Sequence, residues 1–267
     1  QFTMADMGCA DGGTSLAMVG TVLAAVKAKS PQAQLSVVYA DQPRNDFNAL
    51  VSIVHGLTSF ETYLDNTPDV YPLFSGTSFY RQALPSGTLN LGFSATAMHW
   101  LQSKPCDISD HVHMVGAKGA ELEKFRAQAK VDWEQILMCR ARELRSGGKL
   151  VLMNFGIDEE GRYLGNTVGA NMFDTFHEIW QEFLEAGRIN ASEYQSMTLP
   201  QYYNTVEELK FKQQALFDFV AQGGNMIVQY NTSHRLKVDE LAPFKLKLSR
   251  DRVTDENAKV TLLEPNH

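Results

Sequence analysis

The sequence predicts an α/β fold with a mostly parallel sheet, because short apolar runs alternate with longer helical patterns along most of the chain. The apolar runs are bounded by turn residues, as buried parallel strands usually are. A glycine-rich turn joins the first run to the first helical pattern, which is the usual start of an open α/β sheet. The 267 residues suit one large domain with a smaller appendage.

The elements follow in order along the chain. Residues 2–5 resemble the end of a strand and lead through the glycine-rich turn into a helix over residues 15–28, so we expect an N-terminal segment to be missing. Three more buried strands are predicted, and the clearest helix precedes the last of them and stops at a Ser-Gly-Gly turn. The three strands are at 35–40, 88–93 and 149–155, the helix is at 120–145 and the stop is at 146–148.

The pattern changes to amphipathic helices from residue 171 onward, and we divide the chain into a first domain of residues 1–165, a helical cap of 166–222 and a C-terminal segment of 223–267. The cap begins with an amphipathic helix from residue 171. The last segment has three β-like runs, which we expect to pair antiparallel at the edge of the sheet. These runs are 226–230, 244–248 and 260–263.

Composition narrows the classes of partner. The formal charge is -7 and there is no block of Lys or Arg, which argues against nucleic acid and anionic membranes. No apolar run approaches about 18 residues and residues 1–6 do not resemble a signal peptide, so we expect a cytoplasmic protein with a small-molecule partner.

Cysteines and histidines give no sign of a metal. Cys9, Cys106 and Cys139 are far apart and odd in number, which favours buried reduced thiols over disulfides or a zinc site. His111 and His113 lie in a polar loop where we expect them to be solvated. No third ligand has the spacing to complete a metal site, so none is assigned.

The glycine-rich turn, residues 6–14, lies where a first strand hands over to a helix, the place where α/β sheets bind nucleotides. Its spacing matches neither G-x-G-x-x-G nor a phosphate-binding loop, which argues against pyrophosphate and triphosphate recognition. Taken alone, the segment can also be a tight turn that binds nothing.

Two further features suit a nucleoside. Asp41 follows the run 35–40, and a carboxylate at the tip of this strand can accept both ribose hydroxyls; a surface turn acid is the alternative. A nucleobase needs a flat apolar wall and a hydrogen-bonding group, which Phe79 and Ser78 supply. Core packing of Phe79 is the alternative.

Four segments in order resemble the SABATH methyltransferases, a family named for salicylic acid, benzoic acid and theobromine enzymes. The resemblance covers about residues 1–210, and the four motifs together are specific. Residues 6–12 resemble D-L-G-C-S-S-G, residues 41–48 resemble D-L-P-x-N-D-F-N, residues 76–86 resemble G-S-F-Y-x-R-L-F-P-x-x-S, and residues 94–101 resemble S-S-Y-S-L-H-W-L.

This resemblance implies a Rossmann-like class I methyltransferase fold with a helical cap over the acceptor site, S-adenosylmethionine (SAM) as cofactor and a possible homodimer. In the first domain it implies cofactor contacts from Asp6, Gly8, Cys9, Thr14, Asp41, Gln42, Ser78, Phe79 and Ser94. On the acceptor side it implies Thr96, His99, Trp100, Phe173 and Phe176.

Two positions depart from the family pattern. Thr14 stands where an Asn often contacts the cofactor, and Thr96 stands where the family usually has an aromatic residue. The second change enlarges or repolarises the acceptor pocket, so the identity of the acceptor stays open.

The chemistry expected is transfer of the methyl group to a small-molecule carboxylic acid, giving a methyl ester. A carboxylic acid is already ionised at pH 7, so its attack on the methyl group needs no general base. His99 and Trp100 are therefore expected to orient the carboxylate, and a satisfied core histidine is the alternative for His99.

Three other functions remain. The same fold can methylate a ring nitrogen, as in the xanthine branch of the family, although His99 beside Trp100 favours a carboxylate. A NAD-dependent oxidoreductase lacks support because G-x-G-x-x-G is missing. The third alternative is a module that binds SAM without catalysis, and only an activity measurement distinguishes it from an enzyme.

Overall fold

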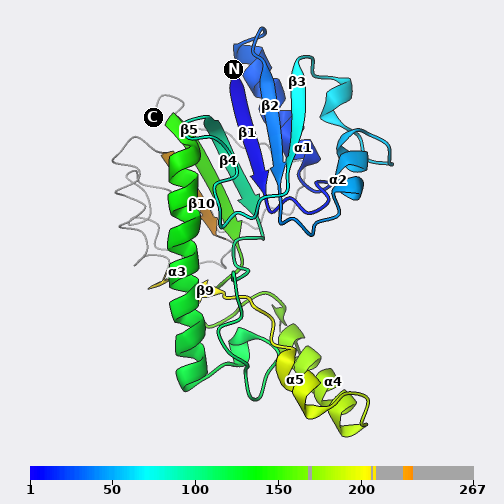
Figure 1. The fold of residues 1–267 in the computed structure, drawn as a ribbon, viewed down its shortest axis with the longest axis vertical. Coiled ribbons are helices and arrows are strands. Elements are labelled where there is room, and N and C mark those ends of the chain that lie inside the picture. Colours follow the sequence, from blue (N-terminus) through cyan, green and yellow to red (C-terminus); the bar gives the residue numbers. More distant parts are fainter. Residues whose placement is uncertain (168–169, 206, 209–224, 231–267) are drawn as a thin grey trace. The chain divides into compact units, whose positions relative to one another are not determined.

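A six-stranded parallel sheet organises the chain, with strand order β10-β5-β4-β1-β2-β3 (Figure 1). Every neighbouring pair in this sheet is parallel. The order reverses at β1, which lies between β2 and β4, so the carboxyl ends of these strands form the switch point where α/β proteins bind ligands. The strands are β1 Phe2–Met7, β2 Leu35–Ala40, β3 Val70–Ser75, β4 Leu89–Ala95, β5 Leu144–Asn154 and β10 Asn225–Tyr230.

The structure is a computed structural model, and it describes residues 1–167, 170–205, 207–208 and 225–230. All of these belong to one unit, Gln1–Asn231. The helices are α1 Leu16–Lys29, α2 Phe47–Val54, α3 Gly119–Glu143, α4 Met172–Glu185 and α5 Ala191–Ser196, with 3-10 turns η1 Tyr63–Asp65 and η2 Met114–Gly116. Short strands are β6 Gly156–Ile157, β7 Asn166–Thr167, β8 Ala170–Asn171 and β9 Asn204–Thr205.

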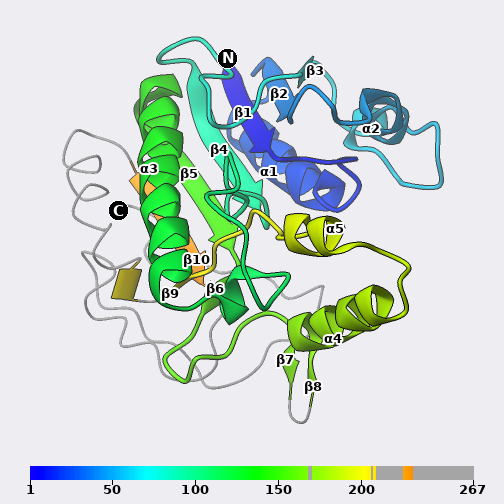
Figure 2. The ribbon, with the colours of Figure 1, turned by 60° about the horizontal axis from the view of Figure 1, so that its bottom comes forward.

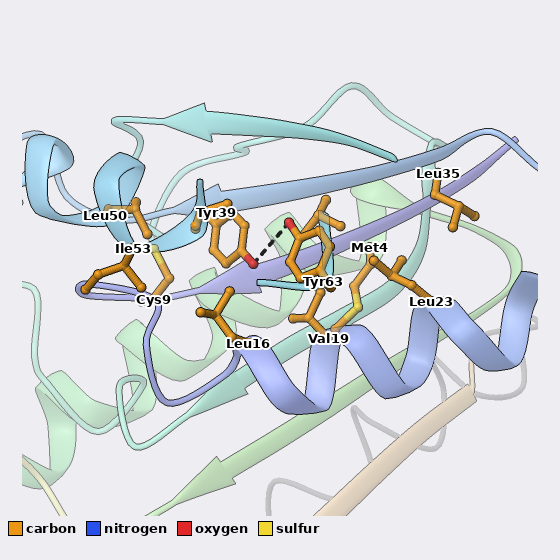
Figure 3. Packing of buried hydrophobic residues seen from close by; sticks show 12 residues of the cluster. Met4, Cys9, Leu16, Val19, Leu23, Leu35, Tyr39, Leu50, Ile53 and Tyr63 are labelled. Carbon is orange, nitrogen blue, oxygen red and sulfur yellow. Dashed lines mark hydrogen bonds between the residues drawn. The ribbon is translucent and has the colours of Figure 1, made fainter. Parts of the chain in front are cut away.

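The two faces of the sheet are covered by different helices, because successive strand residues point to opposite sides. Met4 of β1 packs with Val19 and Leu23 of α1, a cluster that Figure 3 shows together with the Tyr39–Tyr63 hydroxyl pair, 3.3 Å apart. The next residue, Ala5, packs in a second cluster with Trp133 and Ile136 of α3. Helix α3 therefore lies along the face opposite α1 (Figure 2).

Polar caps fix where the helices of the functional region begin. The Asp46 side chain accepts from the N–H groups of Asn48 and Ala49, both at 3.1 Å, and starts α2. Asn171 starts α4 by accepting from the N–H groups of Phe173 and Asp174. These side chains supply acceptors for the backbone N–H groups that a helix start leaves unpaired.

Most predicted elements are confirmed, with boundaries shifted by a few residues. The helix stop predicted at 146–148 is wrong: α3 ends at Glu143, and these residues lie inside β5, where the register with β4 shifts. Gly147, with φ +76°, provides the conformation that this irregularity needs. Strand β3 and helix α2 were not predicted.

The antiparallel pairing predicted for residues 226–230 is also wrong. Strand β10 does lie at the edge of the sheet, but it runs parallel to β5. The chain between β5 and β10 includes α4 and α5, and a long crossover of this kind returns a strand in the same direction. The β-like runs at 244–248 and 260–263 lie outside the described residues.

The structure also describes the three cysteines and bears on membrane-spanning helices. Cys9 and Cys139 are buried free thiols as predicted, whereas Cys106 is only half-buried. In the part of the chain that the structure describes, no helix has the length and apolar character needed to cross a membrane.

Candidate cofactor and acceptor sites

The turn after β1 packs directly against the segment after β4. Gly8 donates its N–H to the carbonyl of Ala40 at 2.8 Å and has φ +76°. A β-carbon at Gly8 would lie 2.3 Å from the β-carbon of Ala97 and 3.7 Å from the ring of Phe79. Only glycine fits both the backbone angle and the contact, and the turn thereby brings the first, third and fourth sequence motifs together.

Asp41 faces the same turn from the end of β2. Its two carboxylate oxygens accept from the N–H groups of Ala10 at 2.8 Å and Gln42 at 2.7 Å. Asn45 adds a bond from its side-chain amide to the Ala10 carbonyl at 2.7 Å. Because an ionised carboxylate offers about four lone-pair sites, Asp41 keeps acceptor capacity for two further hydroxyl groups.

Asp6 is buried inside the switch point, with 3% of its surface exposed. Burial raises its pKa to about 6, a hydrogen bond from the Ser15 hydroxyl lowers it, and the charge of Asp41 adds a smaller increase. Burial also raises the pKa of the Cys9 thiol far above its ordinary value. The Cys9 side chain packs in the cluster under α1 and α2, so its backbone is the part that can face a cofactor.

Of the other residues predicted to contact the cofactor, some lie near the Gly8 turn and others do not. Phe79 lies beside the Gly8 turn, and the buried Ser94 hydroxyl at the end of β4 finds no partner among the described residues. Ser78 turns its hydroxyl to its own loop, where it accepts from the Tyr80 N–H at 3.4 Å. The side chains of Thr14 and Gln42 are exposed, and the described contacts do not join them to this group.

His99 lies at the centre of a cluster of rings. It is 4% exposed, and its ring lies 5.1 Å from that of Phe155, 5.4 Å from Tyr203 and 6.2 Å from Trp100. Burial lowers its pKa to about 4, so His99 is neutral at pH 7. Its Nδ1 atom is buried and finds no hydrogen-bond partner among the described residues.

Trp100 is 42% exposed, so its indole borders the ring cluster and solvent. Its carbonyl accepts from the Tyr80 hydroxyl, which joins the acceptor-side segment to the cofactor-side loop. Thr96 directly follows β4, is exposed and has φ +53°. The chain therefore turns sharply between the two sides.

Helix α4 contributes the two predicted phenylalanines. Phe173 is buried and its ring stacks on that of His113 at 3.8 Å, whereas Phe176 is 49% exposed and meets Phe173 edge-on at 6.3 Å. The structure thus brings Phe173 into the same cluster as His99 through Tyr203, whose ring lies 6.0 Å from Phe173.

Sequence reasoning missed three residues of this cluster: His113, Phe155 and Tyr203. The expectation that His111 and His113 are solvated is wrong, because both are buried, His111 against Asp174 at 3.1 Å and His113 against the Gln201 side chain at 3.0 Å. Burial lowers the pKa of His113 to about 4. Among the described residues, no three His, Cys, Asp or Glu side chains gather as a metal site.

The parallel sheet, the glycine turn after β1 and the aspartate after β2 define a Rossmann-like protein of the class I methyltransferase type. The model of the family described as SAM dependent carboxyl methyltransferase matches residues 1–240. The chain belongs to this family, which is the SABATH group that the four motifs resemble.

Several characterised proteins are similar to the chain. Farnesoic acid carboxyl-O-methyltransferase of Arabidopsis thaliana is 27% identical over 221 residues, which cover 78% of this chain and 60% of the relative. Indole-3-acetate O-methyltransferase 1 of the same plant is 23% identical over 228 residues, which cover 78% and 59%. The chain therefore spans about three fifths of the length of these relatives.

A solved structure shows the same fold. Loganic acid methyltransferase with SAH, the demethylated form of SAM, aligns with a TM-score of 0.67 and 23% identity, over 80% of this chain and 61% of that one. At this identity the likeness concerns the fold.

Proposed function

We propose that the chain carries the cofactor and acceptor sites of a SAM-dependent carboxyl O-methyltransferase that forms the methyl ester of a small-molecule carboxylic acid. One observation supports this most: residues of all four family motifs meet at the carboxyl ends of β1, β2 and β4. The space that a β-carbon on Gly8 would occupy is bordered there by Ala97 and Phe79, while Asp41 accepts a hydrogen bond from the Ala10 N–H. Parallel strands place all four segments at one edge, and the close approach of the Gly8 turn to Ala97 adds a contact that this arrangement alone does not require.

The residues present fit the cofactor. The cradle at Gly8 admits no β-carbon, Asp41 has free acceptor capacity, and the Ser94 hydroxyl is buried and unpartnered among the described residues. We assign the ribose hydroxyls to Asp41, adenine to Phe79 with Ser78, and the methionine part to Asp6 and Gly8. Cys9, Thr14, Gln42 and Ser94 complete the proposed set. The cofactor, when bound, supplies an electrophilic methyl group.

On the acceptor side, His99 and Trp100 hold the carboxylate in line with that methyl group. His99 is neutral at pH 7, so it acts as a hydrogen-bonding orienter and not as a charged partner. The carboxylate needs no base, because it is already ionised, and positioning is the main contribution of the protein. Thr96, Phe173 and Phe176 form the wall of the proposed pocket.

The remaining proposals concern organisation. We propose that residues 1–165 bind the cofactor, that 166–222 form the cap, and that the protein acts in the cytoplasm. A homodimer is a further possibility that the family resemblance suggests. The proposed methyl transfer does not depend on the domain boundaries or on the location of the protein.

A second function, methylation of a ring nitrogen, is favoured by one observation. The buried Nδ1 atom of His99 finds no hydrogen-bond partner among the described residues, and burial lowers the pKa of the ring to about 4, so the proposed acceptor site offers a neutral group that can bind a heterocycle as well as an anion. The two functions differ in their products, because an ester hydrolyses in mild alkali and an N-methyl group does not.

The test is transfer of labelled methyl from SAM to a panel of carboxylic acids and of nitrogen heterocycles, with SAH as the inhibited control. Alkali-labile label on an acid supports the ester proposal. Alkali-stable label on a heterocycle supports the second function. Binding of SAM without transfer to any member of the panel contradicts both and favours a cofactor-binding module.

A further inference from the structure

A buried ion pair closes the carboxyl end of α3. Arg140 and Glu143 have fully buried side chains and bind each other through two bonds, Nε to Oε2 at 2.6 Å and a terminal nitrogen to Oε1 at 2.7 Å. Burying two charges costs several kcal/mol, which their attraction offsets only when further hydrogen bonds satisfy both groups. The destination of those further bonds therefore indicates what the pair is for.

They all end on one short stretch of backbone, residues 79–84. Arg140 donates to the carbonyls of Phe79 at 2.7 Å and Arg81 at 2.9 Å. Glu143 accepts from the N–H groups of Ala83 at 2.5 Å and Leu84 at 3.2 Å. The pair thus binds both ends of this stretch, its first carbonyl and its last N–H.

The carbonyl between the two Arg140 contacts is also bound from α3. Gln135 donates its side-chain amide to the Tyr80 carbonyl at 3.1 Å. Residues 79–84 belong to no helix or strand, so this stretch has no ladder of its own to set its path. Local bonds exist, from the Arg81 N–H to the Ser78 carbonyl at 2.9 Å and from the Gln82 side chain to the Leu84 carbonyl at 2.8 Å, but side chains of α3 bind the carbonyls of residues 79–81 and the N–H groups of residues 83 and 84.

We propose that Arg140 and Glu143 are positioning residues for adenine recognition, which hold the backbone of residues 79–84 so that Phe79 faces the cofactor beside Gly8. The inference rests on the proposed assignment of adenine to Phe79. Holding α3 against the sheet alone would not require charges, because a well-packed apolar pair does this as well or better. An apolar pair cannot bind carbonyls and N–H groups.

The experiment replaces the whole pair, since removing one partner would leave an unpaired buried charge. The double variant Arg140→Met/Glu143→Leu keeps similar volume and removes all four bonds to residues 79–84. The matched control is Glu123→Leu/Arg126→Met, which makes the same exchange at a pair three residues apart on the exposed part of the same helix and also removes the bond from Arg126 to Glu208 at 2.7 Å. Thermal unfolding is recorded for both.

The readout is binding of SAH and of S-inosylhomocysteine, which differs in carrying hypoxanthine for adenine, by calorimetry. The wild type is expected to bind SAH more tightly, because the two bases differ in their hydrogen-bonding groups and Ser78, directly before this stretch, is the proposed hydrogen-bond partner of adenine. The buried double variant is expected to bind SAH at least about tenfold more weakly and to lose most of its preference for adenine, since small displacements of a positioning group cost large factors. The control is expected to keep both affinity and preference.

A third variant keeps the inference falsifiable if the double variant does not fold. Arg140→Lys retains the charge but replaces a planar fork by one ammonium, so it cannot reach both carbonyls and Glu143 together. We expect it to fold, to lose part of the adenine preference, and to melt at a lower temperature than the wild type, because some buried carbonyls lose their donor. Stability loss in either folded variant with unchanged preference would show a purely structural pair and overturn the inference.

The binding data distinguish failure of the proposed function from failure of this inference. A wild type that binds neither SAH nor SAM contradicts the cofactor assignment, and the inference falls with it. A wild type that binds SAH with adenine preference, combined with buried-pair variants that do the same, contradicts the inference alone.

Discussion

The cofactor side and the acceptor side of the switch point are built in different ways. On the cofactor side, Asp41 and Gly8 are tied to backbone groups of the strands and turns around them. On the acceptor side, His99 lies among aromatic rings and its Nδ1 atom finds no partner among the described residues. The first site is shaped mainly by the backbone at the sheet edge, and the second is shaped mainly by packed side chains.

This difference bears on what each site can recognise. Backbone groups at a sheet edge change little when side chains are exchanged, so they suit a cofactor that stays the same across a family. The ring cluster that we propose as the acceptor wall is assembled from segments far apart in sequence, including Phe155, Phe173 and Tyr203. Any of them can change without disturbing the sheet, which fits relatives named for acids as different as farnesoic acid and indole-3-acetate.

The largest effect is expected where the two sides touch, at Gly8→Ala. A left-handed conformation costs a non-glycine residue about 1–2 kcal/mol, and overpacking adds about 1–3 kcal/mol. The new methyl group would lie 2.3 Å from Ala97, so the turn must move and SAH binding should be lost. Urea unfolding and calorimetry measure the two consequences.

Gly147→Ala is the matched control for that variant. Gly147 has the same φ of +76°, but nothing lies within 4 Å of an added β-carbon. It should therefore show the backbone cost alone and keep SAH affinity. Equal losses of stability and binding in the two variants would mean that the Gly8–Ala97 contact does not matter.

Next in size is the pH dependence of Asp6→Asn. A pKa raised from 3.8 to about 6 corresponds to about 3 kcal/mol of destabilisation once the carboxyl is ionised. Between about pH 4 and 6 the native protein keeps a proton that the unfolded chain has released, so wild-type stability falls as pH rises through this window. Asp6→Asn should remove that fall.

Urea unfolding from pH 4 to 8 checks the sign. The stability of Asp6→Asn should exceed that of the wild type by up to about 3 kcal/mol at pH 8, with the gap closing near pH 4. SAH affinity should fall in the same variant, because Asp6 is assigned to the methionine part. The exposed Asp65→Asn controls for loss of one negative charge. A gap that widens toward low pH would contradict the assignment.

Trp100→Phe tests the acceptor side alone. It keeps an aromatic ring but removes one N–H donor, which should cost roughly 1.5–3 kcal/mol for a bond to a charged group. That is about tenfold to a hundredfold in kcat/KM for the acid, with SAH affinity nearly unchanged. Full activity on a carboxylate would show that Trp100 does not hold the acceptor.

The contrast between the two sides also explains what the sequence could predict. Strand β2 and the position of Asp41 at its end follow from a local apolar run and a turn, and the structure has the strand where it was predicted. Strand β3 was missed because Tyr71 and Leu73 are half exposed and Pro72 interrupts the run, so it lacks the pattern of a buried strand.

The acceptor cluster was harder for a physical reason. His113 and Tyr203 become neighbours only when the loop before η2 and the segment around Gln201 pack together, and no local period records such a contact. The resemblance did include residues 199–202, which was the available signal. Phe155 follows β5 directly, so a search of all strand ends at the switch point would have found it.

The smallest expected effect is that of Asp41→Ala, and it can have two causes. SAH affinity should fall by at least about tenfold, or 1.4 kcal/mol. However, the substitution also removes the acceptor for the N–H groups of Ala10 and Gln42, which loosens the turn whether or not Asp41 binds the ribose. Affinity for SAH alone therefore cannot separate the two causes.

A ligand lacking one hydroxyl separates them. If Asp41 accepts from the ribose, the wild type should bind SAH more tightly than its 2′-deoxy analogue, and Asp41→Ala should bind the two equally. Asn45→Ala is the control, because it removes only the bond from that side chain to the Ala10 carbonyl. It should weaken both ligands by the same small factor and keep the preference between them. A preference that survives in Asp41→Ala would place the ribose elsewhere and reduce Asp41 to a residue that shapes the cofactor-side turn.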